Sequence, residues 1–443
     1  MSNKAKTTTP NPDGKPALTP KLRFPEFLGG GSWNDVPIAS ILNIRDERCL
    51  PSTDAPLYSL TIENGVTAKT DRYNREFLVR DSGNKKYKLV EPNDIVYNPS
   101  NLRWGAINYS QLTHSVVVSP IYEVLSLGDS SANFLEFIAC SVMRGEQIRR
   151  FITKGQGTLV ERIAVKVEDF LSTNLPVPPT RAEQQKIAEC LSSVDELIAA
   201  QARKLDALKT HKKGLMQQLF PREGETQPRL RFPEFQNAGE WEESPLSNFI
   251  LSLDAGVSVN AGDRPANKTE FGVLKTSAIT KGLFDPEENK VVLAEIEQSR
   301  LKESVCAGTI VICRKNTPAL VGANAYVESS HENLFLPDLL WAAKPREGVL
   351  MRFLAFILGS DKGRAALSRL AKGSSESMSN ITKPDVLAFS VMAPTPDEQQ
   401  RIADCLTSLD DLIAAQTQKL DALKTHKKGL MQQLFPSPEE VEA

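Results

Sequence analysis

The sequence predicts a mixed α/β (α+β) chain with an internal pseudo-two-fold repeat, in which two domains are separated by two long antiparallel coiled-coil helices. Three observations predict this fold class. An 18-residue segment occurs twice without change, a heptad pattern of apolar residues runs through both copies, and the stretches between them alternate short strand and helix patterns. At 443 residues the chain is also long enough to form two separate cores.

The repeated segment, KLDALKTHKKGLMQQLFP, spans residues 204–221 and 419–436. A second repeat, LRFPEF, occupies residues 22–27 and 230–235. Self-similarity at a fixed spacing indicates that the chain consists of two copies of one structural unit.

The two copies differ almost completely between these markers. Each LRFPEF segment is followed at the same distance by a tryptophan, Trp33 or Trp241, and beyond it residues 34–165 and 242–380 share little. Random sequence change after a duplication would not leave 18 consecutive residues identical. We therefore interpret the chain as a fixed frame that carries two different domains.

Both copies carry the apolar spacing of a coiled coil, alternating four and three residues over about five heptads. The apolar positions are Ile187, Leu191, Val194, Ile198, Leu205, Leu208, Leu215 and Leu219 in the first copy and Ile402, Leu406, Leu409, Ile413, Leu420, Leu423, Leu430 and Leu434 in the second. Polar residues interrupt the pattern only at Gln201 and Lys212, and at Gln416 and Lys427. The pattern predicts two helices that pack against each other.

The helix ends are also marked in the sequence. Thr180, and either Thr395 or Asp397, are suited to cap the first turns, whereas Pro221 and Pro436 end the helices. Each helix should be about 55 Å long at roughly 1.5 Å per residue. Only a short linker joins the first helix to the second domain, which favours antiparallel packing.

These features define the expected boundaries. We expect a disordered lead at residues 1–20, a first domain at 21–178, a first helix at 179–221, a linker at 222–241, a second domain at 242–393, a second helix at 394–436 and an acidic tail at 437–443. Further apolar residues on the helices, among them Met216 and the alanines at 199, 200, 414 and 415, leave two interpretations open. They thicken the coiled coil, or they form two equivalent docking surfaces for two copies of a partner.

Both middle regions predict short strands and an apolar helix. Strands are expected at residues 94–97, 115–118, 309–313 and 325–327, and helices at 133–150 and 350–370. A glycine-bearing basic loop then follows in each half, at residues 154–157 and 372–375.

Several polar side chains in these regions suit contacts with DNA. Asn and Arg can form paired hydrogen bonds to adenine and guanine edges, and lysines in glycine loops suit phosphates. The candidate DNA-binding residues are Asn98, Asn101, Arg103, Lys154 and Gln156 in the first half and Arg314, Lys315, Asn316, Lys372 and Ser374 in the second. The alternative for each is an ordinary polar turn.

Composition excludes several other functions. The six cysteines form no CxxC pair, which argues against a disulfide framework or structural zinc and suits a cytoplasmic protein. There is no GxxxxGK[ST] loop and no membrane-length apolar run, and carboxylates such as Asp94 and Asp285 are expected to be solvated or structural. The net charge of −2 predicts that the chain alone holds DNA weakly.

The chain resembles the specificity (S) subunits of type I restriction–modification systems over nearly its whole length, from residue 22 to about 436. The resemblance is carried by the PxEQQxI-like starts of the helices at residues 179–187 and 396–402, the repeated helix and the LRFPEF segments. Within the domains it is carried by residues 94–98 and 103–106, and more loosely by 308–322.

The resemblance implies a function in double-stranded DNA recognition without catalysis by this chain. Each domain would be a target-recognition domain that reads one half of a split site, and the helices would set the gap between the halves. Two methyltransferase subunits would dock on the helices and flip adenines for methylation from S-adenosylmethionine. Motor–nuclease subunits would use ATP and Mg. No metal or cofactor is expected in this chain.

Two other classes of function remain open. A coiled-coil scaffold that only displays two domains would explain the repeat but not the divergent domains. A stand-alone DNA-binding regulator should be more basic and should need no partners. Exchanging one middle region discriminates these readings, because only the specificity subunit predicts a change in one half of a DNA motif.

Overall fold

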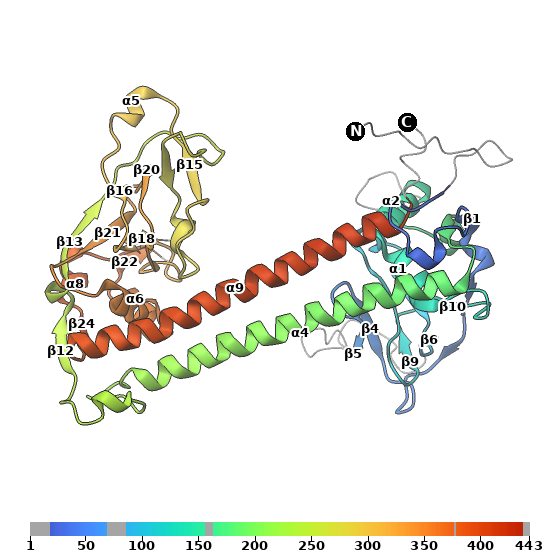
Figure 1. The fold of residues 1–443 in the computed structure, drawn as a ribbon, viewed down its shortest axis with the longest axis horizontal. Coiled ribbons are helices and arrows are strands. Elements are labelled where there is room, and N and C mark those ends of the chain that lie inside the picture. Colours follow the sequence, from blue (N-terminus) through green and yellow to red (C-terminus); the bar gives the residue numbers. More distant parts are fainter. Residues whose placement is uncertain (1–17, 69–85, 156–162, 376–377, 437–443) are drawn as a thin grey trace. The chain divides into compact units, whose positions relative to one another are not determined.

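The computed structural model describes residues 18–68, 86–155, 163–375 and 378–436 (Figure 1). The chain divides into two compact units. Unit 1 consists of Met1–Ala202 together with Gln418–Ala443, and unit 2 consists of Arg203–Thr417. Each unit therefore contains one mixed α/β domain and a segment of each long helix.

The two predicted long helices are present. They are α4 (Arg181–Leu219) and α9 (Pro396–Leu434), each 39 residues long. Thr180 Oγ1 accepts a hydrogen bond from the Glu183 N–H at 3.3 Å, which confirms the predicted cap. Helix α9 has Pro396 at its first position, where the missing N–H costs no hydrogen bond, and Asp397 lies inside its first turn.

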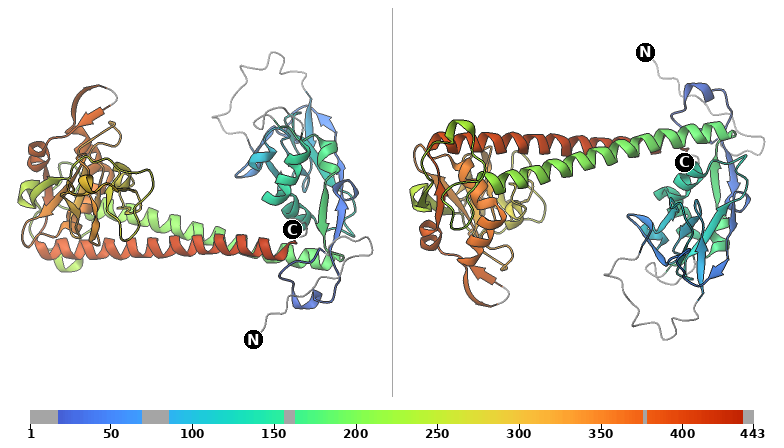
Figure 2. Two further views of the ribbon diagram at one scale, coloured as in Figure 1. Left: turned by 90° about the horizontal axis from the view of Figure 1, so that it is seen from above. Right: turned by 90° about the horizontal axis from the view of Figure 1, so that it is seen from below.

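In unit 1 the beginning of α4 lies beside the end of α9, as the views in Figure 2 show (green and red). Ile187 and Leu191 of α4 share a hydrophobic core with Leu434 of α9. Lys427 Nζ of α9 lies 2.6 Å from Asp195 Oδ1 of α4. The helices are therefore antiparallel within this unit, as predicted.

Unit 2 repeats this arrangement with the helices exchanged. Leu219 at the end of α4 shares a core with Ile402 and Leu406 near the beginning of α9. Lys212 Nζ lies 2.5 Å from Asp410 Oδ1. Lys212 and Asp410 occupy the same positions of the repeat as the ion pair of unit 1, so the contacts confirm the pseudo-two-fold repeat. The lysine that interrupts each heptad pattern is a partner in this ion pair.

Each unit has a four-stranded antiparallel sheet of the same topology, in which the last strand along the chain pairs with the first and the second. In unit 1 the order is β2 (Leu42–Ile44), β10 (Glu123–Leu127), β7 (Ile95–Tyr97) and β8 (Ile107–Tyr109). In unit 2 the order is β13 (Ile250–Ala255), β21 (Leu340–Pro345), β17 (Ile310–Cys313) and β19 (Asn324–Tyr326). The two domains thus share one sheet topology, although their sequences differ.

A second pair of strands leads into each long helix. Strand β11 (Asn174–Val177) pairs with β1 (Asn34–Pro37) before α4, and β24 (Ser390–Ala393) pairs with β12 (Glu242–Pro245) before α9. The strands predicted at residues 94–97, 115–118, 309–313 and 325–327 are confirmed as β7, β9 (Val116–Val118), β17 and β19.

The remaining strands differ between the units. Unit 1 adds a sheet in the order β3 (Arg48–Cys49), β6 (Tyr87–Val90) and β9, and a hairpin of β4 (Tyr58–Thr61) and β5 (Gly65–Ala68). Unit 2 adds one sheet of β15 (Asn289–Val291), β14 (Gly272–Leu274), β20 (His331–Phe335) and β16 (Ser304–Val305), and another of β18 (Lys315–Asn316), β23 (Met378–Asn380) and β22 (Lys372–Ser375). Short helices are α3 (Val167–Leu171), α5 (Glu295–Gln298) and α8 (Lys383–Ala388).

The prediction of one continuous helix per domain is wrong. Residues 133–150 form α1 (Leu135–Met143) and continue into α2 (Gly145–Lys154), and residues 350–370 form α6 (Met351–Gly359) and α7 (Asp361–Arg369). The residue between each pair is extended, with ψ of 136° at Arg144 and 157° at Ser360. In unit 2, Ser360 Oγ caps the new helix by accepting the Gly363 N–H at 3.0 Å. The apolar pattern continues across both breaks and conceals them.

The LRFPEF segments join the two long helices in each unit. The N–H of Leu22 donates to the carbonyl of Gln433 at 2.9 Å, and the N–H of Leu230 donates to the carbonyl of Gln218 at 3.0 Å, near the last turns of α9 and α4. The last three residues of each segment form a short 3₁₀ turn, η1 (Pro25–Phe27) or η7 (Pro233–Phe235).

Besides contacting the end of one long helix, each LRFPEF segment also forms an ion pair with the start of the other long helix. Arg23 donates two hydrogen bonds to the Glu183 carboxylate, both 2.7 Å, and Arg231 does the same to Glu398 at 2.8 and 2.7 Å. Leu18 forms a β-bridge with Trp33, so the predicted disordered lead is wrong at this residue, and residues 1–17 lie outside the described residues.

Candidate nucleic-acid interface

The loop between β7 and β8 in unit 1 carries three of the predicted DNA-binding residues. We call residues 98–106 the reading loop of unit 1. The loop is closed by a hydrogen bond from the Asn98 N–H to the Ala106 carbonyl (2.9 Å) and by Gly105, whose φ of 84° favours glycine. Asn101 is exposed, and Arg103 is half-buried. The Asn98 side chain is buried, and its Oδ1 accepts the Ser100 N–H at 3.1 Å, so it also holds the loop.

Unit 2 has a matching loop between β17 and β19. Residues 314–323, the reading loop of unit 2, are closed by a hydrogen bond from the Cys313 N–H to the Ala323 carbonyl (2.7 Å) and by Gly322 with φ of 75°. Lys315 is exposed. Arg314 donates from Nε to the Asp338 carbonyl at 2.6 Å, which fixes its guanidinium at the base of the loop.

Asn316 is the third predicted residue of this loop. Its side-chain Oδ1 accepts the Thr317 N–H at 2.8 Å, and its Nδ2 lies 3.6 Å from Cys313 Sγ. Like Asn98 in unit 1, Asn316 uses part of its amide within the loop. Base contact by the candidates in either loop stays a prediction.

In unit 2 the structure brings together the two segments that were predicted separately. Strand β23 pairs with both β18 and β22, and Asn380 is opposite Lys315 on one side and Lys372 on the other. Residues 372–375 are therefore a strand, and the prediction of a loop there is wrong. The backbone of β22 places Lys372 and Ser374 in the same small sheet as the reading loop.

Unit 1 shows the equivalent connection. The Val165 N–H, just after the basic segment of unit 1, donates to the Pro99 carbonyl of the reading loop at 3.1 Å. In unit 2 the Ile381 N–H donates in the same way to the Arg314 carbonyl at 2.9 Å. Gln156 lies outside the described residues. In both units, therefore, a backbone hydrogen bond links the reading loop to the residues that follow the glycine-bearing basic segment, which is 154–157 in unit 1 and 372–375 in unit 2.

Lys154 is the last residue of α2 and lines a small basic cavity. Its Nζ donates to the carbonyl and hydroxyl of Ser172 at 2.8 and 3.1 Å. The cavity has a volume of about 270 Å³ and is lined by Arg150, Thr153, Lys154, Thr173 and Asn174. Two cationic side chains beside hydroxyl groups are suited to bind a phosphate oxygen. Arg150 was not among the residues predicted from the sequence, although the Arg149–Arg150 pair on an amphipathic helix was a usable signal.

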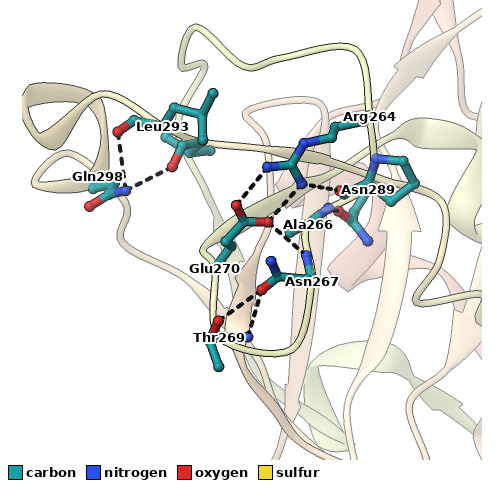
Figure 3. Close-up of polar contacts among 10 residues, drawn as sticks. Arg264, Ala266, Asn267, Thr269, Glu270, Asn289, Leu293 and Gln298 are labelled. Carbon is teal, nitrogen blue, oxygen red and sulfur yellow. Dashed lines mark hydrogen bonds and ion pairs between the residues drawn. The ribbon is translucent and has the colours of Figure 1, made fainter.

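A loop of unit 2 before β14, which was not predicted from the sequence, is held by several polar contacts (Figure 3). The Arg264 guanidinium donates two hydrogen bonds to the Glu270 carboxylate, at 2.7 and 2.6 Å, and the Asn267 N–H donates to the same carboxylate at 2.9 Å. Buried Asn289 accepts the Ala266 N–H at 2.8 Å. These contacts hold a surface loop that carries exposed Lys268 in one conformation.

The Arg264 hydrogen bonds lower the pKa of Glu270 to about 2, with a further contribution from the Asn267 N–H. Because this pKa lies below the ordinary value of 4.5, the carboxylate stabilises the loop above pH 4.5, and that contribution is lost as the pH falls through about 2. NMR titration of the side-chain carboxyl should give a midpoint near pH 2, moving upward in Arg264→Gln. A wild-type midpoint near 4.5 would show that the pair does not persist in solution.

Asp94 has a structural role, as expected. It is buried, its Oδ2 lies 2.6 Å from Arg45 Nε, and it accepts the Glu91 N–H at 2.8 Å. Burial raises the pKa of Asp94, against the lowering effects of the Glu91 N–H and of Arg45. Among the described residues there is no cluster of histidine, cysteine and carboxylate side chains that could hold a metal. Within the same residues no helix has the length and apolar character needed to cross a membrane.

The long helices carry exposed apolar residues at equivalent positions. Leu197 of α4 is 57% exposed and Leu412 of α9 is 49% exposed. The alanines at 199, 200, 414 and 415 are exposed as well. Of the predicted heptad residues, Ile187, Leu191, Val194, Leu205, Leu219, Ile402, Leu406, Leu420 and Leu434 are buried, and Ile198, Leu208, Leu215, Leu409, Ile413, Leu423 and Leu430 are half-buried. The alanines therefore lie on the surface and do not thicken the coiled coil.

Two units with one frame, joined by repeated helices and carrying different loops at the same position, define a DNA-recognition protein with two reading domains. A family model described as "Type I restriction modification DNA specificity domain" matches residues 33–210 and again residues 239–425. The chain belongs to this family of type I restriction–modification specificity subunits.

Two relatives and two solved structures are similar to this chain. The type I restriction enzyme MjaVIII specificity subunit of Methanocaldococcus jannaschii is 24% identical over 370 residues, covering 81% of this chain and 83% of the relative. The putative MjaX specificity subunit of the same organism is 24% identical over 316 residues, covering 65% of each chain.

The solved structures share the fold. The S subunit of a type I system from M. genitalium has a TM-score of 0.60 and 15% identity, with 95% of this chain and all of that chain covered. A chain from a study of complex assembly and conformational transition of the type I R-M system has a TM-score of 0.51 and 15% identity, covering 92% of this chain and 98% of that one.

Proposed function

We propose that the domain of unit 1 reads one half of a split, asymmetric DNA sequence and the domain of unit 2 reads the other, within a type I restriction–modification complex. One observation carries this proposal. The reading loops close in the same way in both units, by a hydrogen bond across the loop and a glycine with positive φ, yet their exposed side chains differ. A shared frame with different side chains suits the reading of two different base sequences.

The long helices are proposed to set the gap between the two half-sites. A helix of 39 residues is about 58 Å long at roughly 1.5 Å per residue. A turn of DNA is about 34 to 36 Å, so a spacer of this length suits half-sites separated by one turn or more. DNA bending would absorb several base pairs of mismatch at an elastic cost of about 1 to 6 kcal/mol.

Two methyltransferase subunits are proposed to dock on the helices, one on each copy of the exposed apolar surface around Leu197 and Leu412. These partners would bind S-adenosylmethionine and methylate adenine, and motor–nuclease subunits would use ATP and Mg. The near-neutral net charge of −2 supports a need for partners that contribute to DNA binding. A coiled-coil scaffold would not require two domains that differ, and a stand-alone regulator would not require a surface for partners.

Domain exchange tests the proposal. Residues 242–393 are replaced by the corresponding segment of another type I specificity subunit, and adenine methylation is mapped in cells that also express the neighbouring methyltransferase subunit. We expect a split motif that depends on this chain, of which one half changes and the other stays. The reciprocal exchange of residues 34–165 should change only the other half.

The alternatives predict other results. No methylation motif, with the methyltransferase soluble and bound, favours a coiled-coil scaffold. A motif that needs no partner favours a stand-alone regulator. A change in both halves after one exchange contradicts the assignment of one half-site to each unit.

A further inference from the structure

Trp104, in the reading loop of unit 1, is an unusual surface residue. The sequence has four tryptophans, of which Trp33, Trp241 and Trp341 are buried, whereas Trp104 is 61% exposed. A large aromatic side chain left in water on a binding domain is a recurring sign of a contact residue, because its burial contributes more than that of other side chains.

The loop presents Trp104 in a fixed direction. Leu102, two residues earlier, is fully buried, and the Trp104 N–H donates to the Asn101 carbonyl at 3.0 Å. Gly105 follows in the left-handed region and donates its N–H to the Leu102 carbonyl at 2.8 Å. A side chain held in place before binding loses little conformational entropy when a ligand arrives.

The surroundings of Trp104 define what can bind there. The Arg103 guanidinium lies over one side of the ring, 4.6 Å from its centre, so the opposite side and the edge remain for a ligand. Ile62, at the tip of the β4–β5 hairpin and itself exposed, places its Cγ2 atom 3.9 Å from where a Cβ on Gly105 would lie. The site thus combines an apolar contact surface with a nearby positive charge.

The reading loop of unit 2, all of whose residues the structure describes, has no exposed aromatic side chain at the equivalent position. In its reading loop the residue before the matching glycine, Gly322, is Val321, which is 1% exposed. A partner that binds both copies of the repeated frame needs a surface that both units share. A feature that is present in one unit but not in the other suits a ligand that differs between the units. Under the proposed function, that ligand is the DNA half-site.

We propose that Trp104, together with Ile62, contacts the C5-methyl group of a thymine in the half-site read by unit 1. This inference rests on the proposed function and deepens it. Thymine is the base that presents a methyl group in the major groove, where apolar side chains recognise it. The positive charge of Arg103 beneath the ring suits a site that faces the negative field of DNA.

Replacing thymine by uracil tests the contact, because uracil lacks the methyl group and keeps every hydrogen-bonding group. The complex of the full chain with its methyltransferase partner is titrated with duplexes carrying the mapped motif, with each thymine of the unit 1 half-site replaced in turn. We expect one replacement to weaken binding roughly fourfold, the factor for one buried methyl group.

Trp104→Ala should weaken binding to the thymine duplex on the order of tenfold and abolish the thymine–uracil difference at that position. Ile296→Ala, which removes a side chain that is 75% exposed in unit 2, is the matched control and should change neither value. Uracil in the half-site of unit 2 should affect wild type and Trp104→Ala equally.

Three outcomes would overturn the inference. Wild-type binding could be insensitive to uracil throughout the half-site, or Trp104→Ala could retain the wild-type thymine–uracil ratio. Alternatively, Trp104→Ala could fail to bind the methyltransferase, which would make Trp104 a protein contact. A wild-type complex that methylates no split motif defeats the proposed function itself, whereas a clear motif without a uracil effect defeats only the role of Trp104.

Discussion

Glu398→Ala is expected to lower the free energy of unfolding of unit 2 by about 3–5 kcal/mol. The Glu398 side chain is 1% exposed and that of Arg231 is 9% exposed, and two hydrogen bonds join them. Removing the carboxylate leaves the Arg231 guanidinium buried without a counter-charge. Unfolding in urea, monitored by hydrogen exchange of backbone amides in β17 and β21, measures the loss of free energy of unfolding in unit 2 separately from unit 1.

Glu234→Ala is the matched control. Glu234 lies in the same LRFPEF segment and pairs with Arg401 at 3.0 Å, but both side chains are about half exposed. Such a pair contributes about 1 kcal/mol at most. Equal losses in the two variants would contradict the view that burial makes the Arg231–Glu398 pair decisive. Replacing both Arg231 and Glu398 by methionine should recover most of the stability, because no buried charge is then unpaired.

Phe435→Ala is expected to destabilise unit 1, although Phe435 follows the second domain in the chain. The side chain is 1% exposed, and its ring centre lies 5.9 Å from that of Trp33 and 5.5 Å from that of Phe137. Truncating a buried phenylalanine costs about 3–5 kcal/mol. Hydrogen exchange should accelerate in β7 and β10 and stay unchanged in β17 and β21.

Leu412→Ala is the control for this prediction. Leu412 is also in α9, but it is 49% exposed, and its truncation should change the free energy of unfolding of either unit by no more than about 0.5 kcal/mol. Faster exchange in unit 2 after Phe435→Ala, or no change in unit 1, would show that the end of α9 is not part of the core of unit 1.

The long helices could be predicted because their signals are local. The heptad spacing, the cap at Thr180 and the prolines after each helix lie within one continuous stretch of sequence. The partners of the polar heptad residues could not be predicted in this way. Lys212 forms an ion pair with Asp410, which lies nearly 200 residues later in the sequence, because antiparallel packing brings the two side chains together. The Arg23–Glu183 pair likewise depends on tertiary structure.

The candidate interface was only partly predictable for the same reason. The reading loops follow recognisable apolar strands, so their positions were evident, whereas the burial of Asn98 depends on how the loop folds back. The strand character of residues 372–375 depends on pairing with β23, and the glycine in this segment suggested a loop instead. Arg150 was missed because its cavity is formed by a turn more than 20 residues later.

The division of the chain has a consequence for the order of folding during synthesis. Unit 2 is one continuous segment, Arg203–Thr417, and all of its residues have been made once Thr417 is added. Unit 1 needs Leu434 and Phe435 for its core, and these are made later still. The first domain to be synthesised is therefore the second to be completed. Until then its apolar surface is unprotected, and a chain interrupted before α9 ends leaves the earlier domain unfinished.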